Sequence, residues 1–131
     1  MQKKRDIMNS TKREGLVKMT YAELLRKIKT ASAWYVGSFM SEFVEHYDRY
    51  CDDPVEKAKF IEYMYQEYDG GNTFESIRTK CYAVMSIVEN RKVIEALEYV
   101  INGNDKKIEP ETKTNAREFL KDIRANKVKL P

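Results

Sequence analysis

The segment from residue 73 to residue 102 carries two apolar stripes that a single straight helix could not bury on one side. At about 100° per residue, the first stripe occupies one arc of a helix and the second falls roughly opposite it. The first comprises Phe74, Ile77, Cys81, Val84, Met85 and Val88, and the second Val93, Ile94, Leu97, Val100 and Ile101. We therefore predict a break at residues 89–92, with Asn90 as the N-cap of the second helix. The alternative is an unbroken helix buried on both sides at the centre of a bundle.

Helix-start patterns mark the segments that would pack on this centre. Thr20 and Glu23 form a capping box, after which apolar residues at helical spacing continue to Tyr50. This stretch is either one long helix or two helices bent near Gly37. Asp53 and Pro54 are typical of the start of a helix that runs to about residue 69. Its expected buried stripe is Val55, Ala58, Ile61, Tyr65 and Tyr68, with Phe60 and Met64 beside it.

The remaining composition favours a single all-α domain. Pro110 is expected to begin a last helix that ends near residue 125. No alternating strand pattern appears, and 131 residues are enough for one core. We predict a compact bundle of five to six helices over residues 20–131. Residues 1–19 hold six Lys or Arg against two acidic residues and are predicted to form a basic arm.

Cysteine usage and hydropathy indicate the compartment. Cys51 and Cys81 have neither the number nor the spacing of a disulfide framework or a zinc site. The basic N-terminus is not followed by an apolar run, and no stretch of 18 apolar residues occurs. The sequence therefore predicts a cytoplasmic protein that does not associate with membranes.

Catalytic patterns are weak throughout the chain. His46 shares a helix face with Glu42 and Tyr50, but one histidine and one carboxylate are only half of a metal site. Cys51 would lie about 140° from His46 around a helix, so the two cannot act as a nucleophile pair. The turn before Thr73 lacks the spacing of a phosphate-binding loop. We predict a structural or solvent-exposed histidine, no catalytic or metal-binding residue and no cofactor.

The last helix carries the clearest polar pattern. Four cations fall within about 80° of one another on one side, and no acidic residue lies among them. They are Lys113, Arg117, Lys121 and Arg124, called the basic ridge below. A row of cations at helical spacing suits a phosphate backbone, which dominates non-specific nucleic-acid affinity. The alternatives are a solvated face or a ridge that meets acidic residues of the same or another chain.

The middle of the chain is acidic and rich in aromatic residues. Residues 38–69 hold nine Asp or Glu against three Lys or Arg, and ten of the aromatic residues lie between residues 34 and 68. Most of these aromatics fit helical stripes, but Tyr63 projects away from its own. Exposed tyrosines are favoured interface anchors. We therefore predict a protein-binding face that includes Glu45, Asp48 and Tyr63.

Two hypotheses for function follow. In the first, the protein is a non-enzymatic binding module, a subunit or accessory protein of a nucleoprotein complex. Its basic ridge and basic arm hold DNA or RNA, and its acidic-aromatic face holds a protein. In the second, it binds only protein, and its acidic face imitates nucleic acid on a basic partner. Small inhibitors encoded by phages or mobile elements act in this way. An enzyme ranks third, because no catalytic constellation supports it.

Overall fold

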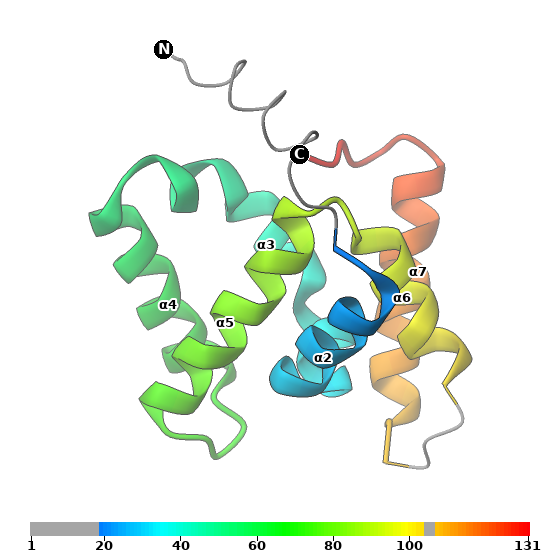
Figure 1. The fold of residues 1–131 in the computed structure, drawn as a ribbon, viewed down its shortest axis with the longest axis horizontal. Coiled ribbons are helices and arrows are strands. Elements are labelled where there is room, and N and C mark those ends of the chain that lie inside the picture. The colour runs from blue at the N-terminus through cyan, green and yellow to red at the C-terminus, as the bar shows by residue number, and fades with distance from the viewer. Residues whose placement is uncertain (1–18, 104–106) are drawn as a thin grey trace.

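The computed structural model describes residues 19–103 and 107–131, which form six α-helices and, within these ranges, no β-strand. Figure 1 shows α4 and α5 on one side of the molecule, α6 and α7 on the other, and α2 and α3 between them. The expected compact all-α bundle is confirmed. The helices are α2 (Tyr21–Ala31), α3 (Ala33–Asp52), α4 (Pro54–Tyr68), α5 (Phe74–Glu89), α6 (Val93–Asn102) and α7 (Pro110–Arg124).

The hydrophobic core lies where α3 meets the other helices, because α3 packs against all five of them. Helix α5 packs against α2, α3, α4 and α6, so the segment 73–102 is central as expected. Cys81 and Leu97, which represent the two opposite stripes of that segment, are both fully buried. The largest fully buried side chains are Tyr35, Phe43, Leu24, Met40, Met64, Ile77, Ile87 and Leu97.

The predicted break between the two stripes is confirmed, but Asn90 does not begin the second helix. It is the C-cap of α5, and its side-chain Nδ2 donates to the Ser86 carbonyl at 2.7 Å. Arg91 follows with φ of +60°, and Lys92 N–H donates to the Ile87 carbonyl at 3.0 Å. This is the helix-ending motif in which a left-handed residue satisfies the last carbonyls. Helix α6 then starts after Lys92 without a side-chain cap.

The segment 21–50 forms two helices divided at Ser32, so both alternatives, one long helix and a bend near Gly37, are wrong. Ser32 has φ of +80°; its N–H donates to the Ile28 carbonyl, and its hydroxyl accepts from Tyr35 N–H at 3.3 Å. One serine therefore ends α2 and caps α3. Gly37 lies inside α3, where a Cβ atom would come within 2.7 Å of Thr112 Cγ2 and 2.8 Å of Val100 Cγ1. The glycine allows close packing of α3 against α6 and α7.

Helix α4 is rotated relative to the expected stripe. Val55 and Ala58 are exposed, whereas Phe60, Ile61 and Met64 are buried. The reason is that α4 packs against α3 and α5 together, and only the side that carries Phe60 and Met64 faces both. On α5, Phe74 is also more exposed than expected; its ring packs against the edge of Tyr65 at 5.5 Å.

The predicted helix starts at Thr20 and Asp53 are confirmed. Thr20 N–H donates to Glu23 Oε1 at 2.8 Å, and Thr20 Oγ1 accepts from Glu23 N–H at 3.1 Å. The backbone hydrogen bond from Thr20 to the carboxylate, together with the neighbouring Thr20 hydroxyl, lowers the pKa of Glu23. Asp53 accepts from Val55 N–H at 2.7 Å. None of the helices in the described ranges is long and apolar enough to cross a lipid bilayer. The predicted arm, residues 1–19, lies outside the described residues except for Met19, which is buried.

Candidate functional site

The basic ridge lies on the outer side of α7. Ala116, Leu120 and Ile123 lie about 90° from the ridge around the helix and face the core, where α7 packs against α3 and α6. The two end residues of the ridge contact α6 and its C-terminus. Lys113 Nζ donates to the Gly103 carbonyl at 2.7 Å, and Arg124 Nη2 pairs with Glu98 Oε2 at 2.6 Å. These contacts fix how α7 lies beside α6, so part of the ridge has an intramolecular role.

The two middle residues of the ridge, Arg117 and Lys121, are exposed, and their side chains make no ion pair or hydrogen bond with another described residue. Together with Asn102 and Arg124 they line a shallow groove of about 640 Å³ between α6 and α7, called the basic groove below. Among the described residues, Glu98 is the one carboxylate in its lining, and Arg124 already neutralises that charge. The groove therefore presents a net positive surface to solvent.

The residues predicted to bind protein do not form one compact cluster. Glu45 and Asp48 are exposed on α3 and form no ion pair with another described residue. Tyr63 on α4 is 38% exposed, but its hydroxyl points toward Glu42 and donates to Glu42 Oε1 at 3.4 Å. Relative to Glu42, Glu45 lies about 60° and Asp48 about 120° around α3. Only Tyr63 is therefore held at the interface between α3 and α4.

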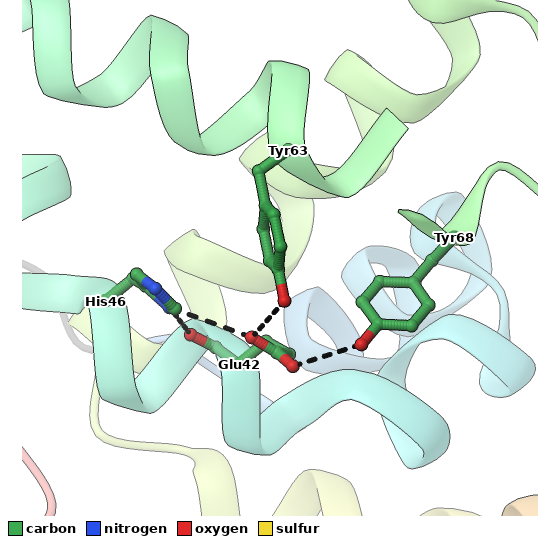
Figure 2. Close-up of polar contacts among 4 residues, drawn as sticks. All are labelled: Glu42, His46, Tyr63 and Tyr68. Carbon is green, nitrogen blue, oxygen red and sulfur yellow. Dashed lines mark hydrogen bonds and ion pairs between the residues drawn. The ribbon is translucent and has the colours of Figure 1, made fainter. Parts of the chain in front are cut away.

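Glu42 is the centre of a polar cluster that the sequence pattern revealed only in part. Figure 2 shows Tyr63 and Tyr68 reaching from α4 to the two oxygens of this carboxylate on α3. Tyr68 donates to Oε2 at 3.3 Å, and His46 Nδ1 lies 3.8 Å from Oε1. The neighbouring Tyr68 hydroxyl, partial burial and the Glu42 charge raise the pKa of Tyr63. The Tyr63 phenol therefore stays protonated at neutral pH and can donate.

His46 is oriented by the backbone as well as by this cluster. Its Nδ1 lies 2.9 Å from the Glu42 carbonyl oxygen, which can only accept, so Nδ1 donates this hydrogen bond. Its ring packs against Phe60 at 5.1 Å, and the side chain is about a quarter exposed. The expectation of a structural or partly exposed histidine agrees with this placement. The described residues include no group of three or more His, Cys, Asp or Glu that could hold a metal ion.

The sequence pointed to Glu42 and His46 because they are four residues apart on one helix. It missed Tyr68 as a partner of Glu42, and it missed Glu98 and Asn102 in the basic groove. These contacts join different helices, and no spacing within one helix reveals them. Of the predicted ridge, the fold leaves Arg117 and Lys121 available for a ligand, because their side chains are exposed and unpaired within the described residues.

Comparisons with models of known protein families, with curated proteins and with solved structures find no match for this chain. Its function therefore has to be inferred from its own residues and from the geometry described above. Two surfaces are candidates for binding a partner. One is the basic groove, and the other comprises Glu45, Asp48 and Tyr63 of α3 and α4, called the acidic-aromatic residues below.

Proposed function

We propose that the protein is a non-enzymatic module that binds the phosphate backbone of DNA or RNA through the basic groove. The observation that carries the proposal is the pair Arg117 and Lys121, which are exposed and unpaired within the described chain beside a carboxylate that Arg124 neutralises. Counterion release from a nucleic acid would favour binding to such a groove. A guanidinium also matches the geometry of a phosphate and can donate two parallel hydrogen bonds.

The number of cations along the groove determines the expected strength of binding and its dependence on salt. Arg117 and Lys121 are separated by about 6 Å along the helix axis, and Arg124 lies about 5 Å further on. Three to four phosphate contacts give a salt slope of about −3 on duplex DNA. Non-specific sites of this kind have dissociation constants of about 10⁻⁴ to 10⁻⁶ M at physiological salt, so binding is measured most clearly at low salt.

The test is fluorescence anisotropy with labelled DNA and RNA of mixed sequence over a range of salt concentrations. The double variant Arg117→Glu and Lys121→Glu should bind all sequences more weakly and to the same degree. The magnitude of its salt slope should be smaller by about two units. Circular dichroism should be unchanged, because neither side chain is in the core. The matched control is Arg49→Glu with Lys59→Glu, which makes the same change in net charge on exposed residues of α3 and α4.

Two outcomes would contradict the proposal. Wild-type protein that binds neither DNA nor RNA at low salt excludes the basic groove as a nucleic-acid site. An equal loss in the control variant would show that net charge, and not the groove, determines binding.

The second candidate function is binding to a basic protein partner through the acidic-aromatic residues. Its specific support is that Glu45 and Asp48 are exposed on α3 and form no ion pair within the described part of the chain. Here Glu45→Lys with Asp48→Lys should abolish capture of a protein partner, while reversal of Arg117 and Lys121 should not. The opposite pattern of loss would favour the nucleic-acid function.

A further inference from the structure

A second groove, of about 1090 Å³, lies between α2 and α6 and is lined by aromatic side chains. Tyr21 and Leu25 of α2, Trp34 of α3 and Tyr99 of α6 contribute to it. We call it the aromatic groove. Tyr21 is 63% exposed and Tyr99 is 39% exposed, so both side chains are accessible to a ligand in the groove. Neither the basic ridge nor the acidic-aromatic residues account for this surface.

The aromatic groove and the basic groove meet along α6. Glu98 and Asn102 both line each of the two grooves. Residues four apart lie on the same line of a helix, so these two side chains form the crest between the grooves. Tyr99 lies about 100° to one side of Glu98 and Ile101 about 60° to the other, which places Tyr99 in the aromatic groove and Ile101 in the basic groove.

The charges in the aromatic groove do not exclude an anionic ligand. Its two carboxylates both have cationic neighbours, since Glu98 pairs with Arg124 at 2.6 Å and Glu95 lies 3.9 Å from Lys92 Nζ. Lys29 is exposed in the lining and forms no ion pair with any residue that the structure describes. An anion that crosses the crest therefore meets cations on both sides of it.

We propose that the nucleic acid bound by this protein is single-stranded, with its backbone in the basic groove and its bases stacked on Tyr99 and Tyr21. This inference rests on the proposed function and specifies its ligand class. Stacking on aromatic side chains requires unpaired bases, and it tolerates any sequence because every base has a flat face. A duplex keeps its bases stacked on one another and could use only the basic groove.

The experiment uses Trp34 as the reporter, because it lies in the aromatic groove and is the only tryptophan of the chain. Its fluorescence is titrated with three ligands of about 15 nucleotides, near the upper end of the site size of a single-strand-binding domain. They are oligo-dT, an abasic strand of the same length and a duplex. Oligo-dT should bind most tightly and quench Trp34, whereas the abasic strand and the duplex should leave the fluorescence unchanged.

Variants separate stacking from charge. The affinities for all three ligands are measured by fluorescence anisotropy of labelled strands, which does not depend on Trp34. Tyr99→Ala should weaken oligo-dT binding at least about fivefold and leave binding of the abasic strand unchanged, and Tyr99→Phe should retain tight binding. Tyr82→Ala is the matched control, since Tyr82 is an exposed tyrosine on α5 that lines neither groove. Circular dichroism and the intact affinity for the abasic strand show that the variant is folded.

The outcomes distinguish this inference from the proposed function. Equal affinities for oligo-dT, abasic strand and duplex, with no effect of Tyr99→Ala, would overturn the single-strand inference while backbone binding stands. Absence of binding by every oligonucleotide at low salt would overturn both, and the aromatic groove would then serve another class of ligand, such as a peptide.

Discussion

Replacing Gly37 by alanine tests whether close packing, rather than helix flexibility, explains this glycine. In an ordinary helix interior the change would stabilise the protein by about 1 kcal/mol, because alanine is the better helix former. Here the new Cβ would lie 2.7 Å from Thr112 Cγ2, 2.8 Å from Val100 Cγ1 and 3.3 Å from the Thr112 carbonyl oxygen. Favourable carbon contacts are about 3.5–4.0 Å, so both methyl groups would have to move by roughly 0.7 Å or more.

The cost of that movement decides the sign of the effect. Thr112 and Val100 are β-branched and buried, so neither can easily adopt another rotamer. Overpacking of this kind costs about 1–3 kcal/mol, and stiff neighbours favour the upper part of that range. After the gain in helix propensity is subtracted, Gly37→Ala should destabilise the protein by about 1–2 kcal/mol.

Urea unfolding followed by circular dichroism measures this change. The midpoint should fall by roughly 0.5–1 M. Ser41→Ala is the control on the exposed side of α3 and should change stability by no more than about 0.5 kcal/mol. In a Thr112→Ser background the nearest methyl group is absent while the hydroxyl that bonds Ser38 Oγ remains, so Gly37→Ala should cost less there. A higher midpoint for Gly37→Ala in the natural background would refute the close-packing explanation.

Three further predictions concern the core, the thiols and the first helix start. Leu97→Ala should lower the free energy of unfolding by about 2–5 kcal/mol because Leu97 is fully buried, and an unchanged urea midpoint would contradict this. Only one thiol per native chain should react rapidly with a disulfide reagent, because Cys51 is exposed whereas burial raises the pKa of Cys81 to about 12; two rapid equivalents before denaturation would show that Cys81 is accessible. Thr20→Ala should cost about 0.5–2 kcal/mol in thermal or urea unfolding, since it removes the hydroxyl that accepts from Glu23 N–H, whereas Thr20→Ser keeps a hydroxyl and should cost less.

Local patterns of the sequence determined which residues form helices. The capping box at Thr20, the Asp53 and Pro54 pair and Pro110 each mark a helix start through interactions within a few residues, and all three starts occur where predicted. The opposite stripes around Cys81 and Leu97 required a break for the same local reason, since one straight helix cannot turn two arcs toward one partner.

Tertiary structure decided what local preference could not. Gly37 has a low helix propensity, yet the helix continues through it. The glycine is required there because α6 and α7 occupy the space that a Cβ would fill. The chain turns instead at Ser32 and Arg91, two non-glycine residues with positive φ whose hydrogen bonds hold that conformation. The Glu42 cluster and the meeting of the two grooves along α6 likewise join side chains from different helices. Such contacts depend on how the helices pack, and the period of a single helix contains no information about the rotation of its neighbours.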